Sequence, residues 1–562
     1  MLEAFGTTHN TYLRETRGDA MNSYVNETLR ILTNARVHDL IKLWRRESGH
    51  HSPRGRKQTI SEHAALGVML IQMRIDGDLR FNNMAETIVR LNDSQRESLG
   101  IRSHDVEEAF WYDRLWRAVD RLQRLVDAYP GNRRKLPSRE EYKRILDARD
   151  PEESELKTAR LSTLCNALLD GSVQMMPREL RRRFKGNTAL DATKIPLNGR
   201  LGGPSKMNPD GAHLSCNYDG GWYVREGNHD GSSSTYKDKR DWAIEAEITT
   251  MTANTPGEAA DFPLLAHGVS FHKPGKIKGE GGRLVRSLVA RGYPIDHFIA
   301  DRAYLPRSKA HELQGPLTNI GARLVFDYDY DERGRTTYYA DVIQVAGQWY
   351  LHYMPAALIG AHDLYDEERR VAGTDEKLVH AAKELRDERL AERELYRLKP
   401  KGRHRADGSR QYMYPAPALY GGIAVDEKTG ELLEPITKKT IVIPRAEKAL
   451  KFGQEYPYKS PKWKAFYGLR NTIESQNAYV KDTATEDIGS PMKRRARGNT
   501  FASLAVAVAL ATANVRKILT FIQEQLARVQ VTSKNKDFAK TYYSSSELPA
   551  ATVPMGTPPP DH

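Results

Sequence analysis

Cysteine is almost absent from this chain, which has only Cys165 and Cys216 among 562 residues. A disulfide framework and a cysteine-rich zinc site are therefore excluded, and a reducing, intracellular compartment is expected. The sequence also lacks a His-Glu-x-x-His zinc motif and a Gly-x4-Gly-Lys-Ser/Thr phosphate loop. We therefore expect neither that zinc chemistry nor a dependence on ATP.

Long apolar runs are missing as well. The longest, Phe501 to Val515, is interrupted by Ser503, Thr512 and Asn514. This stretch is too short and too polar to cross a bilayer, so it predicts a buried helix and no membrane partner. The first residues show no basic region followed by an apolar stretch, so no secretory signal is expected and the predicted location is cytoplasmic.

Positive charge, by contrast, is abundant. The formal net charge is +13 and the sequence pI is about 9.3. A basic balance favours a polyanionic partner, because each Lys or Arg that meets a phosphate releases a counterion. Charge that serves only solubility explains the same balance equally well. The length predicts two to four domains.

The N-terminal part, residues 1–150, is predicted to be an all-α domain. Apolar residues recur three and four apart through 25–44, 63–75 and 106–129, and a break at Gly77 precedes a further helical pattern over 84–91. Helix, break and helix suit either a helix-turn-helix that binds DNA ends or a plain helical bundle. Residues 151–185 are predicted to be a basic linker.

Residues 186–328 change to a pattern of strands and helices. Strands are expected over 188–196, 213–224, 242–251, 297–304 and 322–328, with helices over 284–291 and 307–313. Three strands followed by alternating helix and strand predict an α/β fold with a mixed sheet flanked by helices.

The rest of the chain interrupts and then completes this core. Residues 329–460 are predicted to be an insertion with strands over 336–354 and 440–444, a charged helix over 375–398 and a basic stretch over 399–417. Residues 461–530 return to the core with helices over 462–481 and 502–529. The tail, 531–562, is predicted to be disordered.

Four polar residues share one face of the helix expected over 462–481. Tyr467, Arg470, Glu474 and Lys481 stand at offsets of 0, 3, 7 and 14, which fall within roughly 60° of one another at about 100° per residue. Such a stripe can present a metal-binding carboxylate between two cations, or it can be a solvated face with ion pairs.

Two aspartates, Asp191 and Asp301, lie in or at the end of predicted apolar strands. A carboxylate flanked by buried strand residues is costly unless it is paired or bound to a metal. Together with Glu474 these residues could form a three-carboxylate site for Mg²⁺ or Mn²⁺, which prefer oxygen ligands. Taken singly, each aspartate is better explained as a strand-end cap or an ion-pair partner, for example Asp301 with Arg302.

The spacing Tyr467-x2-Arg470-x3-Glu474-x6-Lys481 resembles the signature of the DDE-type transposases of bacterial insertion sequences, in the branch with the Y-x2-R-x3-E-x6-K pattern. The segments Leu190-Asp191-Ala192-Thr193 and Asp301-Arg302-Ala303-Tyr304 are similar to the surroundings of the family's two aspartates. The resemblance implies a ribonuclease-H-like catalytic core with a strand-rich insertion over roughly 186–528.

The resemblance also implies an activity. Asp191, Asp301 and Glu474 would hold two Mg²⁺ or Mn²⁺ ions, and the enzyme would cleave DNA at transposon ends and join them to target DNA. The implied partners are double-stranded DNA, namely terminal inverted repeats and target, and a second copy in a synaptic homodimer, close to the bacterial nucleoid. DNA contacts are expected from Tyr467, Arg470, Lys481, Lys493, Arg494, Arg495 and Arg497, and base stacking from Trp349.

Several alternatives stay open from the sequence. Asp219 and Asp230 compete with Asp191 for the position of the first aspartate, although their surroundings are Gly-rich and loop-like. Trp349 needs no function if it lies in a core, and each basic segment is equally well a charged loop. The alternative functions are a nuclease on the same core without strand transfer and a DNA-binding protein that has lost catalysis.

Overall fold

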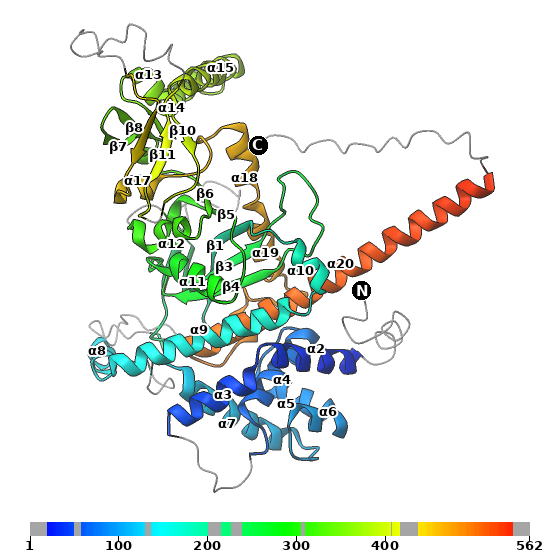
Figure 1. Ribbon diagram of the computed structural model, residues 1–562. Coiled ribbons are helices and arrows are strands. Elements are labelled where there is room, and N and C mark those ends of the chain that lie inside the picture. The colour runs from blue at the N-terminus through cyan, green and yellow to red at the C-terminus, as the bar shows by residue number, and fades with distance from the viewer. Residues whose placement is uncertain are drawn as a thin grey trace.

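The computed structural model describes residues 20–49, 58–129, 136–199, 215–225, 239–304, 309–405, 407–415 and 436–542. The fold is mixed α/β, as the sequence predicts. In Figure 1 the first helices lie at the bottom, the main sheet in the middle and the inserted segment at the top.

The described residues up to Arg183 form helices and no strands. Their bounds are α2 (Ala20–Asn34), α3 (Val37–Glu47), α4 (Glu62–Ile75), α5 (Phe81–Arg90), α6 (Asp93–Leu99), α7 (Glu108–Val126), α8 (Arg139–Asp147), α9 (Pro151–Val173) and α10 (Arg178–Arg183). The helix expected over 25–44 is two helices, because Arg36 adopts a left-handed conformation with φ of 50°. Helix α4 is apolar on nearly every side and is buried along most of its length, as a central helix should be.

The segment predicted as a basic linker, residues 151–185, is instead part of the core. Helix α9 buries Leu164, Leu168 and Leu169, and it packs against α2, α20 and strand β4. Gly171 allows a close approach, because a Cβ there would stand 2.5 Å from the carbonyl oxygen of Ile31. In a linker these leucines would be exposed to water, and their burial stabilises the fold. This explains why the segment forms a core helix and not the predicted linker.

The main sheet has six strands, in the order β2-β3-β1-β5-β6 with β4 also paired to β3. Strand β1 runs antiparallel to β3 and parallel to β5, and β5 runs parallel to β6. The bounds are β1 (Thr188–Pro196), β2 (Gly221–Arg225), β3 (Lys239–Met251), β4 (Ala266–His272), β5 (His297–Ala300) and β6 (Arg323–Phe326). Every residue of β5 is buried, which is typical of a central parallel strand.

Helices and short turns connect these strands. They are α11 (Glu280–Ala290), η2 (Arg302–Tyr304), η3 (Ala310–Glu312) and α12 (Gln314–Asn319). Helix α11 packs against β4, and α12 packs against β6. The strand expected over 297–304 therefore ends at Ala300, and the chain turns directly after Asp301.

The described part of the inserted segment holds two small sheets together with several helices. The first sheet comprises β7 (Arg335–Tyr339), β8 (Val342–Val345) and β9 (Gln348–Leu351), and the second comprises β10 (Lys399–Lys401), β11 (Arg410–Met413) and β12 (Thr440–Ile443). The other elements are η4 (Tyr330–Glu332), α13 (Ala356–Ile359), α14 (Ala361–Ala372), α15 (Glu376–Arg393), η5 (Glu394–Tyr396) and α17 (Glu447–Phe452). The strands predicted over 336–354 and 440–444 and the charged helix are confirmed.

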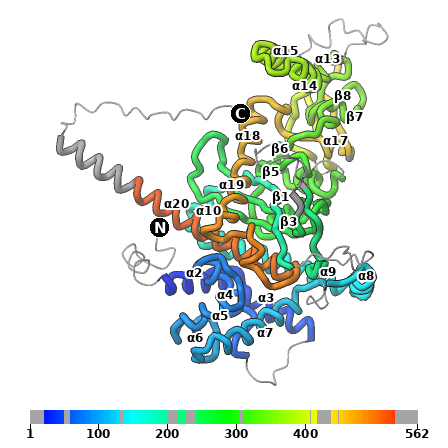
Figure 2. Tube along the Cα trace, turned by 180° about the vertical axis from the view of Figure 1, so that it is seen from behind, coloured from blue at the N-terminus to red at the C-terminus, as the bar shows by residue number. Residues whose placement is uncertain are grey.

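The C-terminal helices return to the main sheet. Helix α18 (Pro461–Gly468) packs against β5 and β6, and α19 (Asn471–Tyr479) packs against β1 and β3. After η6 (Pro491–Lys493), helix α20 (Asn499–Tyr542) packs against α9 and α4 and joins the first helices to the sheet. Figure 2 shows this path from behind, with α20 leaving the body of the molecule.

Helix α20 contains the predicted buried apolar stretch. Its part Asn499–Arg528 is long and apolar enough to cross a membrane, yet 72% of the most apolar window is buried inside the protein. The prediction of a core helix over 501–515 is confirmed. The first part of the predicted tail, up to Tyr542, continues α20, and 543–562 lie outside the described residues.

Candidate active site

The strand register places Asp191 and Asp301 next to each other. The parallel pairing of β1 with β5 ends where Leu190 lies opposite Ala300. Asp191 and Asp301 are therefore the first residues beyond the paired segment. Asp301 follows the carboxyl end of β5, whereas β1 continues past Asp191 to Pro196, paired with β3 alone. In α/β sheets this edge is the usual place for ligands and chemistry.

Each aspartate is held by its own backbone. One oxygen of Asp191, Oδ1, accepts the amide of Ala192 at 3.0 Å, and Oδ1 of Asp301 accepts the amide of Arg302 at 2.6 Å. The other oxygen of each is left to point away from the strand. The carboxylates thus have fixed orientations before any ligand binds, which reduces the entropy lost on binding.

Glu474 reaches the same place from the helical side. The helix predicted over 462–481 is broken into α18 and α19, because the amides of Leu469 and Arg470 bond three residues back, to Phe466 and Tyr467. The break is mild, since Leu469 and Arg470 keep right-handed helical angles. Arg470 and Glu474 remain one turn apart, whereas Lys481 lies past the end of α19.

The guanidinium of Arg470 binds all three acids. Its Nη2 stands 3.2 Å from Oδ2 of Asp191 and 3.1 Å from Oδ2 of Asp301, and its Nη1 stands 2.6 Å from Oε1 of Glu474. The three carboxylates therefore meet at one guanidinium, whereas the sequence predicts that they share two metal ions. The expected phosphate contact of Arg470 is replaced by these ion pairs.

The described residues contain no group of three or more acidic, His or Cys side chains already arranged to hold a metal. Two aspartate oxygens nevertheless share a single guanidinium nitrogen at 3.1 and 3.2 Å. A Mg²⁺ ion binds oxygen at about 2.0–2.1 Å, so each carboxylate would move inward by about 1 Å. In addition, Nε of Arg470 is buried without a hydrogen-bond partner, which makes this arrangement of the arginine less than optimal. The donor set fits a divalent cation once Arg470 withdraws.

Burial at this edge of the sheet raises the pKa of Asp191 from 3.8 to about 6, although Arg470 and the amide of Ala192 act in the opposite direction. The neighbouring charges of Asp301 and Glu247 add to the increase. The charged form of Asp191 is thus disfavoured in the protein without a second cation. A cluster of acids that is costly to keep charged is a common property of functional sites.

This pKa predicts a gain in stability on neutralising Asp191. A folded-state pKa above the usual value means that protonated Asp191 contributes stability that is complete below about pH 4 and is lost as the pH rises through about 6. Asp191→Asn should therefore raise the free energy of unfolding by about 1–3 kcal/mol at pH 7.5 in chelator, with little effect near pH 4. Denaturant titrations across this pH range measure the difference. A variant less stable than the wild type at pH 7.5 would contradict the prediction.

Two other members of the predicted stripe flank the acids. The ring of Tyr467 stacks on that of Trp463, with centroids 4.5 Å apart, and Trp463 is fixed by its Nε1–H bond to Gln454 at 2.8 Å. Burial and the charge of Asp301 raise the pKa of Tyr467. Lys481 lies within the electrostatic range of Asp191, and burial together with nearby Lys194 lowers its pKa.

The predicted basic turn is only partly available for DNA. Arg494 is buried, and its guanidinium donates to the carbonyls of Pro196, Asp487 and Ile488. Lys493 bonds the carbonyls of Asp76 and Thr483 and pairs with Asp487 at 3.4 Å. Lys493 and Arg494 therefore stabilise the turn, and this replaces the DNA contacts expected of them. The side chains of Arg495 and Arg497, by contrast, are exposed.

Trp349 does not lie at the acids. It is 5% exposed and belongs to a small core formed with Val342, Leu351, Leu398, Tyr414 and Ile443. Packing in the inserted segment explains this tryptophan, so the alternative that it is a core residue is favoured over stacking on a DNA base.

The competing aspartates are also placed. Asp219 is fully buried and accepts the backbone amide of Asn499 at 2.8 Å, at the start of α20. A carboxylate at a helix N-terminus satisfies a free amide and complements the helix dipole, which is a structural role. Asp230 lies outside the described residues. The geometry therefore favours Asp191 as the first aspartate.

Sequence reasoning missed a buried group behind the acids. Glu247 of β3 is opposite Ala192 in the sheet and has no exposed surface. It accepts hydrogen bonds from Nε2 of His272 at 2.8 Å and from the hydroxyl of Tyr304. Burial lowers the pKa of His272, but the hydrogen bond and charge of Glu247 outweigh it and the net pKa is raised. Tyr304 follows Asp301 within one turn, so Glu247 fixes the turn that carries Asp301.

Comparison of the chain with protein-family models, with curated proteins and with solved structures found no match.

Proposed function

We propose that this protein is a metal-dependent DNA transposase that cleaves DNA strands and joins their 3′ ends to a target. The observation that carries the proposal is the convergence of Asp191, Asp301 and Glu474, which come from three separate segments, on a single guanidinium. Neither strand-end caps nor surface ion pairs require three distant acids to meet at one point.

The sheet supports a ribonuclease-H-like core. Its order β4-β3-β1-β5-β6 joins an antiparallel trio to two parallel strands, with the first aspartate on the central strand and the second after the adjacent one. Helix α19 packs on β1 and β3 and carries the glutamate. These features support the ribonuclease-H-like core that the resemblance in the sequence implies.

Two divalent cations held by Asp191, Asp301 and Glu474 would supply activation of the attacking oxygen and stabilisation of the leaving oxygen. The remaining residues of the site bind and orient DNA. Release of Arg470 from the acids would free a guanidinium whose fork matches a phosphate, and Lys481 would offer a second cation beside it. Tyr467, held by Trp463, would limit the position of the strand end.

Strand transfer separates this proposal from the nuclease alternative. The purified protein is incubated with Mg²⁺, a labelled duplex that ends in the element's terminal repeat, and a target plasmid. We expect labelled ends joined covalently to the plasmid. Cleavage without joining would favour a nuclease, whereas binding without cleavage would favour a DNA-binding protein that has lost its activity.

A further inference from the structure

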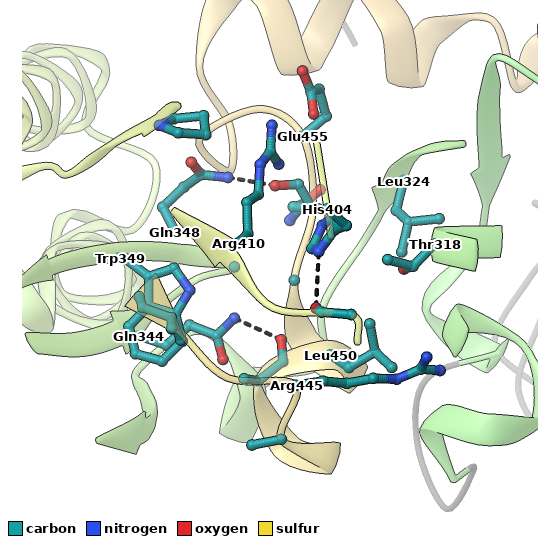
Figure 3. Close-up of a pocket in the computed structure, with 18 of the residues that line it drawn as sticks. Thr318, Leu324, Gln344, Gln348, Trp349, His404, Arg410, Arg445, Leu450 and Glu455 are labelled. Carbon is teal, nitrogen blue, oxygen red and sulfur yellow. Dashed lines mark hydrogen bonds between the residues drawn. The ribbon is translucent and has the colours of Figure 1, made fainter. Parts of the chain in front are cut away.

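A cationic hollow lies between the edge of the main sheet and the second small sheet of the inserted segment. It has a volume of about 800 Å³. Its basic lining comes from β6, from the turn between β10 and β11, and from the segment after β12, and comprises Arg323, Arg403, His404, Arg405, Arg410 and Arg445. Figure 3 shows a neighbouring pocket that shares part of this lining, with His404, Arg410 and Arg445 labelled.

Acidic side chains do not balance this charge. The lining contains two acids, Asp296 and Glu455, and Asp296 is already paired with Arg323 through both carboxylate oxygens. Arg445 and Arg410 are held by neutral acceptors, the amide oxygen of Asn319 at 2.8 Å and the carbonyl of Gly402 at 3.1 Å. Such bonds fix the guanidinium groups without neutralising them.

The rim of the hollow carries two further guanidinium groups. The side chains of Arg403 and Arg405 are exposed, and neither forms a salt bridge with any residue that the structure describes. Asp407, the nearest acid in sequence, accepts the amide of Ser409 at 2.9 Å, and its hydrogen bonds to Ser409 and the charge of Arg405 lower its pKa. The rim therefore carries two guanidinium groups and this one nearby carboxylate.

The turn between β10 and β11 packs closely against the side chain of Arg445. Gly408 has φ of +80°, and a Cβ there would stand 2.4 Å from Cδ of Arg445, so glycine is required for the close packing. His404 Nδ1 lies 3.1 Å from the carbonyl oxygen of Gly408. Partial burial lowers the pKa of His404, and the charges of Arg410 and Arg445 add to this, whereas the hydrogen bond to Gly408 acts in the opposite direction.

The hollow is separate from the three acids. Asp296 precedes β5 and Arg323 begins β6, whereas Asp301 follows the end of β5. Asp296 and Arg323 of the lining therefore stand at the amino ends of β5 and β6, whereas Asp301 stands at the carboxyl end of β5. A single short phosphate ligand cannot occupy both places.

We propose that this hollow is a second DNA-binding surface, which holds backbone phosphates of a duplex away from the point of cleavage. Guanidinium forks match phosphate oxygens, and contacts to phosphates position a duplex without reading its sequence. Because Arg403 and Arg405 are exposed at the rim, they suit a phosphate backbone that passes across the opening better than a small anion enclosed in the hollow. The inference rests on the proposed action on DNA, but binding rather than cleavage tests it.

The test reverses the charge of the rim. Arg403→Glu/Arg405→Glu is compared with Arg369→Glu/Lys383→Glu, a pair with the same change in charge at exposed positions of α14 and α15 that do not line the hollow. Affinity for a labelled duplex is measured by fluorescence anisotropy over a range of salt concentrations. We expect the rim variant to bind the duplex at least about tenfold more weakly than the wild type. The magnitude of its slope of log affinity against log salt should fall by about two, and both changes should be much smaller in the control.

Each other result overturns the proposal in a recognisable way. Equal duplex affinity of the wild type and the rim variant would reject the hollow as a DNA surface and leave the proposed function intact. Loss of inorganic phosphate binding, measured by calorimetry, with unchanged duplex affinity would indicate a small-anion site instead. If the wild type bound no duplex at all, the proposed function would fail together with this inference.

Discussion

Asp301→Asn should lower Mg²⁺-dependent DNA cleavage by about a thousandfold or more and leave the affinity for DNA within about threefold of the wild type. Asparagine keeps the size of the side chain and can still accept the amide of Arg302, but it removes the negative charge that faces Arg470. A divalent cation would then lose one of its anionic oxygens, and the remaining donors would bind it weakly.

A neighbouring carboxylate provides the control for this variant. Asp329 pairs with Arg302 at 3.2 Å and is half exposed, so Asp329→Asn removes an acid close to Asp301 without touching Arg470. Cleavage of a labelled duplex and electrophoretic mobility shifts measure activity and binding in the same preparations. If Asp301→Asn weakened binding and left cleavage unchanged, the assignment of the acids would be wrong.

Arg470→Ala should destabilise the protein in the absence of divalent metal by about 2–4 kcal/mol, and Mn²⁺ should recover most of that loss. Arg470 is the only cation recorded in ion pairs with Asp191, Asp301 and Glu474 among the described residues, and only 17% of its side chain is exposed. Without it, three neighbouring negative charges repel one another. A bound divalent cation would replace the lost positive charge.

Unfolding in chelator and in Mn²⁺ measures this rescue. Arg495→Ala serves as the control, because Arg495 is exposed and does not contact the acids. Arg470→Lys keeps a positive charge without the fork and should show an intermediate loss. A loss in Arg470→Ala that Mn²⁺ did not reduce would mean that the arginine has a structural role only and that metal does not replace it.

Local sequence patterns were sufficient to predict the elements that carry the acids. The strand over 188–196 is confirmed at both ends, and the helices over 63–75 and 106–129 differ from the structure by a few residues. These segments have strong apolar periodicity, so burial and local preference favour the same structure. The α/β class follows from the order of such segments, and the register of β1 and β5 then brings Asp191 beside Asp301.

Other features depend on partners that are far away in the chain, and no local pattern reveals them. Arg494 is indistinguishable in sequence from Arg495, yet its guanidinium is buried against Pro196, nearly three hundred positions earlier. The break between α18 and α19 has no proline, and its angles stay helical. The engagement of Arg470 with the two aspartates likewise depends on the tertiary fold, because only Glu474 is its neighbour along the helix.

Glu247 is an acid in a predicted strand, and the sequence alone does not show whether its side chain is buried or exposed. In the predicted strand over 242–251, Glu247 stands with Glu245 and Thr249 on the polar side of an alternating pattern, which by itself indicates a solvent-facing acid. Such an acid must be paired when it is buried, and its partners, His272 and Tyr304, lie on other elements. Tyr304 belongs to the Asp301-Arg302-Ala303-Tyr304 segment that resembles the family. The resemblance therefore singled out Tyr304, but it did not show that Tyr304 bonds Glu247 and so helps to position Asp301.

Anomalous X-ray scattering from Mn²⁺ in crystals of the protein bound to a cleaved DNA end tests the central claim most directly. We expect manganese peaks within about 2.3 Å of oxygens of Asp191, Asp301 and Glu474, with the guanidinium of Arg470 moved away from the aspartates toward a phosphate. Manganese absent from this place, with Arg470 still bound to all three carboxylates while DNA is present, would contradict it.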